Sequence, residues 1–154
     1  MYLWKIESLK KDIVDGSFTD KQLIPYMVLY AGLYALGIEI TGYLPYKDIN
    51  NWTYALSALN VFIPIAGTIY AYKRNGGGDG ENFASKYFSI GFVVGVRFII
   101  YLIPLMVLMI VYWVIVFGEQ EKLTTTFVEV FLFATWHALL YFQIAKHIGD
   151  TANA

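Results

Sequence analysis

Four long apolar segments alternate with short polar ones along the chain. Each has at least the about 20 residues that a helix needs to cross the about 30 Å hydrocarbon core of a membrane. Helices are expected because lipid offers an open backbone no hydrogen-bond partner. The segments are Leu23–Leu44, Trp52–Tyr72, Tyr87–Phe117 and Thr126–Ala145. This pattern predicts an all-α integral membrane protein, a four-transmembrane-helix bundle with spans of about 20–44, 52–72, 87–117 and 124–147.

The residues before the first segment have the pattern of a short amphipathic helix, with charged residues around an apolar stripe. The apolar positions at helical spacing are Tyr2, Ile6, Leu9 and Ile13. We expect residues 1–18 to lie on the cytosolic face of the membrane as an interfacial helix, with residues 19–154 forming the transmembrane domain. Thr19 followed by Gln22 is a helix-start signal, so the first span is expected to begin at Asp20.

Composition and charge set the class and the orientation. Hydrophobic residues make up 58% of the chain and charged residues 15%, well below the about 25% usual for soluble domains. Of the basic residues flanking the segments, eight lie on one side and two on the other, which predicts cytosolic N- and C-termini in a plasma (inner) membrane. The glycine-rich stretch 73–86 then lies in the cytosol, where a flexible linker is expected.

Several function classes are excluded or disfavoured. The chain has no cysteine and a net charge of −1 without a basic cluster, which argues against a disulfide-stapled domain and a nucleic-acid binder. Enzyme motifs and paired metal ligands are missing, so we expect no catalysis, no metal and no cofactor.

Polar and small residues of the second segment share one helical face. They are Thr53, Ser57, Asn60, Pro64, Gly67 and Ala71, at steps of three and four residues. Pro64 cannot donate to the carbonyl of Asn60, so this face also carries a freed backbone acceptor. The face is expected either to pack closely on another helix or to line an aqueous path.

Two carboxylates lie at similar depths from the outer side, Glu39 in the first segment and Glu129 in the fourth. Gly32, Ala35 and Gly42 line the face of Glu39, where another helix can approach closely. The pair is a candidate cation or proton site near the outer mouth. In the alternative, both carboxylates are partly hydrated at the interface and have no role.

Arg97 is the one lysine or arginine inside the apolar segments, and it follows Gly91 and Gly95 in a small-residue pattern typical of helix packing. Its depth is expected to match that of His137. Arg97 either has a compensating partner, such as a carboxylate or an aromatic ring, or reaches the headgroups from a helix that projects into the cytosol.

These features favour a homo-oligomeric, ion-conducting channel, with a tetramer as the guess, since four helices are too few to enclose a wide path. Its lipid-embedded subunits would be gated by voltage, lipid or a cytosolic regulatory protein contacting residues 1–18 and 73–86, as in a partner-gated bacterial membrane effector. The alternative is a non-conducting membrane subunit or scaffold that binds other membrane proteins. A small-solute transporter is a third hypothesis.

Overall fold

The computed structural model describes residues 1–41, 48–118 and 124–154, and it is helical throughout. Apart from an isolated bridge between Asp48 and Thr124, these residues form no strand. The helices are α1 (Ile6–Val14), α2 (Asp20–Thr41), α3 (Asn51–Arg74), the 3-10 turn η1 (Gly77–Asp79), α4 (Phe83–Phe117) and α5 (Phe127–Ala152). The all-α prediction is confirmed.

The helix starts follow local capping chemistry. Helix α2 begins at Asp20 as expected, and the backbone N–H of Thr19 donates to Gln22 Oε1 at 2.8 Å. Helix α3 begins after Asn50, whose Oδ1 accepts from the N–H of Thr53 at 3.0 Å. These bonds satisfy amide groups that the first helical turn leaves without a partner.

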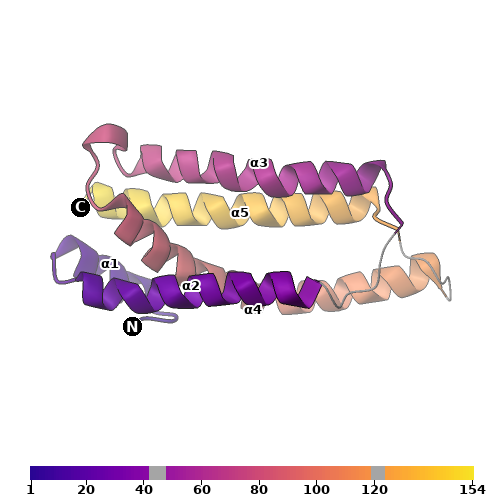
Figure 1. Ribbon diagram of the computed structural model, residues 1–154, viewed down its shortest axis with the longest axis horizontal. Helices are drawn as coiled ribbons and strands as arrows, with labels where there is room; N and C mark the ends of the chain where they lie inside the picture. Colours follow the sequence, from indigo (N-terminus) through magenta and orange to yellow (C-terminus); the bar gives the residue numbers. More distant parts are fainter. Residues whose placement is uncertain (42–47, 119–123) are drawn as a thin grey trace.

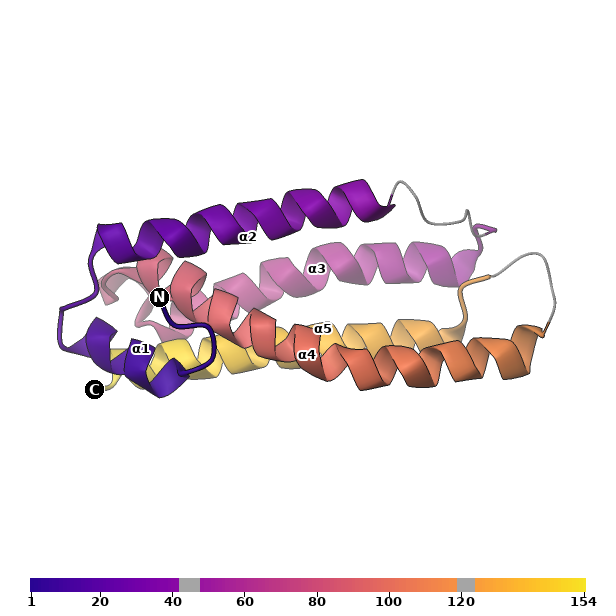
Figure 2. The ribbon, with the colours of Figure 1, turned by 90° about the horizontal axis from the view of Figure 1, so that it is seen from below.

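The long helices form two side-by-side pairs, α3 with α5 and α2 with α4 (Figures 1 and 2). Contacts between α4 and α5 join the pairs, which gives the spatial order α2, α4, α5, α3. Short links would allow each pair of sequence neighbours to pack as an antiparallel hairpin. Instead, α2 and α3 are not among the extensively packed pairs in the described part of the chain. The bundle is therefore open between its two outer helices.

The α3–α5 pair is the closest in the bundle because glycine lets the two helices approach. A Cβ atom on Gly67 would lie 2.5 Å from Tyr141, and one on Gly149 would lie 2.8 Å from Arg74 Nε. Any side chain at either position would need its neighbour to move.

Both termini lie at one end of the molecule, which we call the terminal end, and the chain segments around residues 48–50 and 124–126 lie at the far end (Figures 1 and 2). Most of the buried core is at the terminal end, where α1 packs on α4 and α5 with Ile6 and Leu9 buried. The apolar stripe of α1 is thus covered by protein. That α1 also lies on a membrane surface stays a prediction.

Hydrogen bonds and an ion pair hold α1 in place. Lys10 Nζ lies 2.9 Å from Asp150 Oδ2 on α5 and 3.1 Å from Glu7. Partial burial lowers the pKa of Lys10, but the bonds to Asp150 and Glu7 outweigh it and leave the pKa raised. The hydroxyl of Tyr2 donates to Asp12 at 2.7 Å, which raises the pKa of Tyr2.

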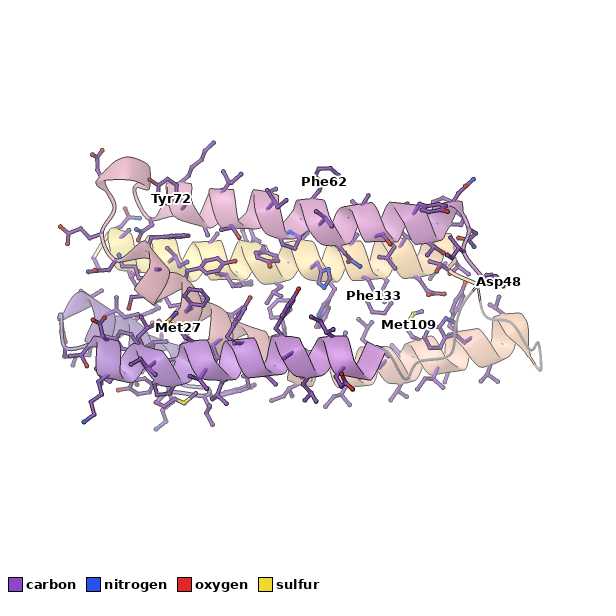
Figure 3. The ribbon with its side chains drawn as sticks, in the orientation of Figure 1. Met27, Asp48, Phe62, Tyr72, Met109 and Phe133 are labelled. Atoms are coloured by element: carbon purple, nitrogen blue, oxygen red, sulfur yellow. The ribbon has the colours of Figure 1, made fainter. Side chains whose placement is uncertain are left out.

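The outside of the bundle is strongly apolar. In the described residues, α3, α4 and α5 are long and apolar enough to cross a membrane. In Figure 3, Phe62 points away from the bundle while Met109 and Phe133 lie between the two helix pairs. The accessible surface is 10089 Å², whereas a compact monomer of 17.6 kDa exposes about 7,900 Å². The open, elongated bundle leaves a large apolar area for lipid or protein to cover.

Docking of α1 should depend on Leu9, which is fully buried. We expect Leu9→Ala to weaken docking by about 2–3 kcal/mol because it leaves a cavity. Hydrogen exchange of residues 6–14 in detergent should then be at least about 30-fold faster, while Val14→Ala, at an exposed position, should change it little. Unchanged exchange in Leu9→Ala would show that α1 is held by its polar contacts alone.

Gly67→Ala should destabilise the α3–α5 pair by about 1–3 kcal/mol through overpacking against Tyr141. Gly32→Ala is the matched control, because no atom lies within 4 Å of a Cβ at Gly32. In thermal unfolding in detergent, the midpoint temperature of Gly67→Ala should be lower than that of the unaltered chain, and the midpoint of Gly32→Ala should not be lowered. Equal midpoints for the two variants would contradict the close α3–α5 contact.

Candidate functional site

A cluster of hydrogen-bonded polar side chains joins α3, α4 and α5 at the far end. Its members are Asn50, Thr53, Tyr112, Trp113, Thr125, Thr126 and Glu129. Thr53 Oγ1 lies 3.0 Å from Thr125 Oγ1, and Asn50 Nδ2 donates to the carbonyl of Thr125 at 2.8 Å. We call this set the far-end polar cluster.

Glu129 is the charged member of the cluster and is 2% exposed. Trp113 Nε1 donates to Glu129 Oε1 at 3.0 Å, and the backbone N–H of Glu129 donates to Oγ1 of the N-cap Thr126 at 3.4 Å. The carboxylate lies in the first turn of α5, where the helix dipole favours negative charge. Glu129 is therefore built into the packing between α4 and α5.

Glu39 lies in a different environment from Glu129. It is exposed on α2, the helix that packs on α4. The expected pair of carboxylates thus consists of one buried group that accepts hydrogen bonds and one group on the outside of the bundle. Of these two carboxylates, Glu39 is the exposed one.

The expected polar face of α3 divides into two parts. Thr53 joins the far-end polar cluster, and Gly67 packs under Tyr141. Ser57 and Asn60 are exposed on the outer surface, and their side chains form no hydrogen bond within the described residues. Close helix packing accounts for Thr53 and Gly67, but it does not account for Ser57 and Asn60.

Arg97 lies between α4 and the N-terminal segment. Its guanidinium is 5.3 Å from the centroid of the Trp4 ring and donates to the Trp4 carbonyl. An aromatic ring is thus the partner, as one alternative predicts, and two further rings, Tyr101 and Trp136, line the same cleft between α4 and α5 as Arg97. The partner at Trp4 was missed because 93 residues separate the two positions; the only signal was a tryptophan in an amphipathic segment.

His137 does not share this cleft. The α5 residues that line it with Arg97 are Trp136, Leu139, Gln143 and His147. The Phe98 ring, next to Arg97, lies 5.1 Å from the Trp136 ring, next to His137, so Arg97 and His137 lie at similar depths, as expected. His137 Nδ1 is buried and has no hydrogen-bond partner in the described residues.

The expected packing glycines differ in what they meet. Gly91 comes within contact distance of Ile144, whereas Gly32 and Gly95 have no atom within 4 Å of a Cβ position. Ala35 is exposed on α2 beside Gly32, and Gly42 lies outside the described residues. The small-residue stripe of α2 is therefore uncovered in a single copy.

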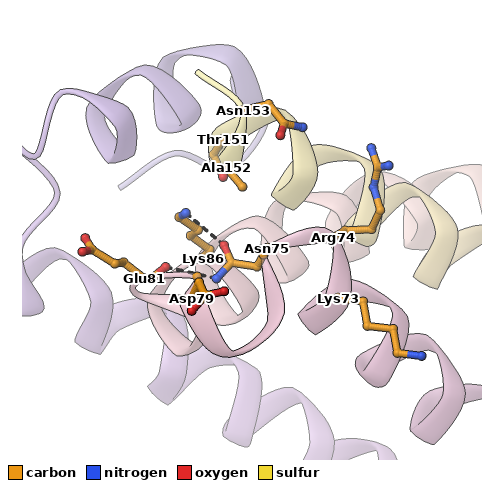
Figure 4. Close-up of a pocket in the computed structure, with 11 residues that line it drawn as sticks. Lys73, Arg74, Asn75, Asp79, Glu81, Lys86, Thr151, Ala152 and Asn153 are labelled. Carbon is orange, nitrogen blue, oxygen red and sulfur yellow. Dashed lines mark hydrogen bonds between the residues drawn. The ribbon is translucent and has the colours of Figure 1, made fainter.

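The glycine-rich segment, expected to be a flexible linker, folds as a compact turn (Figure 4). Buried Asn75 accepts from Lys86 Nζ at 2.9 Å and donates to the carbonyl of Glu81 at 3.1 Å. Gly76 adopts a φ of +101°, and a Cβ on Gly80 would lie 2.0 Å from the Asn75 carbonyl. Lys73 and Arg74 point away from Asn75, so the basic groups around this cleft of about 570 Å³ do not converge.

No group of three or more potential metal ligands occurs among the described residues. Comparisons of the chain with protein-family models, with curated proteins and with solved structures found no match.

The Trp113–Glu129 hydrogen bond should show as coupling in a double-mutant cycle. Glu129→Ala and Trp113→Phe together should cost about 1.5–3 kcal/mol less than the sum of the single changes, as expected for a bond to a charged group. The coupling is measured from the free energies of unfolding of the variants in detergent. Trp52→Phe, at an exposed far-end position, should add to Glu129→Ala without coupling; additivity in both cycles would exclude the bond.

Proposed function

We propose that the protein is a small multi-pass membrane protein that assembles into a homo-oligomer and conducts small ions. The observation that carries this proposal is the exposure of Ser57 and Asn60 on α3. Asn60 is the tenth residue of α3, about 14 Å along the helix, which is near the middle of a hydrocarbon layer about 30 Å thick.

An amide at this depth needs a partner. Transfer of an amide from water into hydrocarbon without a hydrogen bond costs several kcal/mol. Pro64 adds to the cost, because its ring nitrogen cannot donate to the carbonyl of Asn60. Either water or a second copy of the chain therefore covers this face, and a path lined by α3 in an oligomer supplies both.

The proposed topology has four spans, with α2 as the fourth alongside α3, α4 and α5. The position of both termini at one end supports it, because an even number of crossings returns the chain to its starting side (Figure 1). The excess of basic residues around that end favours a cytosolic position for it, so both termini lie on the cytosolic side of the plasma (inner) membrane in this topology. Helix α1 then lies at the cytosolic interface.

Assembly follows from the open bundle. A single copy with the order α2, α4, α5, α3 encloses no path, and its surface exceeds that of a compact monomer by about 2,200 Å², an area similar to a large subunit interface. Closed rotational symmetry, with a tetramer as the working number, would place α3 toward the axis. Exposed Glu39 would attract cations, while buried Glu129 holds the far end together.

Gating by a cytosolic protein fits the parts that lie at the terminal end. Helix α1 and the turn around η1 are the extramembrane parts there, and a partner can reach residues 1–18 and 73–86. A bacterial membrane effector opened by such a partner is the biological setting we propose.

A non-conducting scaffold is the second candidate. It is favoured by the uncovered small-residue stripe of α2 at Gly32 and Ala35, where another membrane helix could pack closely, and by the open space beside Gly95 on α4. In that case Gly32→Leu should abolish recovery of a partner, while Asn60→Leu would leave it intact.

Planar-bilayer recording of the purified protein tests conduction. We expect channel currents above lipid-only controls, and Asn60→Leu should reduce unitary conductance at least about tenfold by removing a polar lining group. Val61→Leu is the matched control, since Val61 is 57% exposed on the same turn and is already apolar. Glu39→Gln should lower cation preference with little change in assembly. Currents no larger than those of lipid alone would end the channel proposal.

A further inference from the structure

The cleft between α4 and α5 at the terminal end is amphipathic along its length. It has a volume of about 520 Å³. The Arg97 side chain reaches toward the N-terminal segment, where it donates to the Trp4 carbonyl, and Gln143 and His147 line the part of the cleft nearer the C-terminus of α5. The other end is apolar and is lined by Tyr101, Trp136 and Leu139, with the Trp136 ring 5.1 Å from Phe98.

His147, at the polar end of the cleft, lies near the depth of lipid headgroups if the helices cross the membrane as proposed, and Arg97 extends its side chain toward the N-terminal segment from deeper in the bundle. Helix α5 ends at Ala152, five residues beyond His147, which corresponds to about 7.5 Å along the axis. The headgroup layer on each side of a bilayer is about 5–8 Å thick. This inference rests on the membrane location in the proposed function, and not on conduction or subunit number.

Arg97 has no anionic partner in the described part of the chain. The carboxylates that form ion pairs near α1, Glu7 and Asp150, both bind Lys10. Arg97 donates only to the Trp4 carbonyl, and its Nε is buried without a hydrogen bond. His147 Nδ1, which lies 3.6 Å from Asp150, is also buried without one. The polar end of the cleft thus holds a cation and unused hydrogen-bonding groups.

We propose that this cleft binds one anionic phospholipid, with its phosphate at Arg97, Gln143 and His147 and an acyl chain along Tyr101, Trp136 and Leu139. A guanidinium binds phosphate oxygens through charge-assisted hydrogen bonds, and it tolerates a ring stacked on its face, as Trp4 is. The apolar wall provides the contact area that free phosphate cannot use. The chemistry recognised is a phosphate that carries an acyl chain.

Native mass spectrometry of the full chain, released from detergent, tests the proposal with three probes: phosphatidylglycerol, phosphatidylcholine and inorganic phosphate. We expect phosphatidylglycerol to bind more tightly than phosphatidylcholine. Arg97→Gln should weaken phosphatidylglycerol binding about tenfold, or about 1.4 kcal/mol. Arg74→Gln, which removes an exposed arginine at the same end, is the matched control and should leave binding unchanged.

Three results would overturn the proposal. The first is equal binding of phosphatidylglycerol by Arg97→Gln and the unaltered chain. The second is a loss of binding in Arg74→Gln equal to that in Arg97→Gln, which would indicate diffuse surface charge. The third is displacement of the lipid by inorganic phosphate, which would indicate a free-phosphate site. If Arg97→Gln fails to fold, Leu139→Trp fills the apolar end from an exposed position and should also weaken binding; retention there would contradict the lipid pose. Arg97-dependent lipid binding without channel currents would support this inference and end the channel proposal. Channel currents without Arg97-dependent lipid binding would support the channel proposal and end this inference.

Discussion

Hydrocarbon offers polar groups no hydrogen-bond partner, and this constraint sorts the polar side chains of the long helices into three groups. Glu129 is satisfied inside the protein by Trp113 and the start of α5. Arg97 is held near the terminal end against Trp4. Ser57 and Asn60 face outward from α3 with no partner in the described residues. In a membrane, Ser57 and Asn60 of a single copy would therefore still need a hydrogen-bond partner.

The terminal end links α1 and the N-terminal segment to the long helices. Helix α1 is fixed to α5 through Lys10 and Asp150, and the segment before it covers Arg97 through Trp4. Displacement of α1 would therefore remove the carbonyl that Arg97 binds and would expose buried Leu9 at once. A cytosolic protein that binds α1 and a lipid that binds beside Arg97 would act on the same contacts.

The sequence predicts the helices well because the apolar segments and the capping residues are local signals. The start of α2 at Asp20 follows from Thr19 and Gln22 alone. The choice of packing partners is not local: links of a few residues allow α3 to pack on α2 or on α5, and the fit of Tyr141 over Gly67 decides it. The burial of Glu129 against α4 and the contact of Arg97 with Trp4 also join segments far apart in the sequence, so counting depths along each helix could not find them.

The central claim is that the outward polar face of α3 meets another copy of the chain, and disulfide cross-linking in native membranes tests it most directly. The chain has no cysteine, so a single substitution reports one position without background. Asn60→Cys should give a covalent dimer on oxidation, because Cα atoms must come within about 7 Å to form the bond. Ile115→Cys, at a position that is 77% exposed on α4, should stay monomeric. If Asn60→Cys stays monomeric while the same oxidant forms a disulfide in a control thiol compound added to the sample, the account is contradicted.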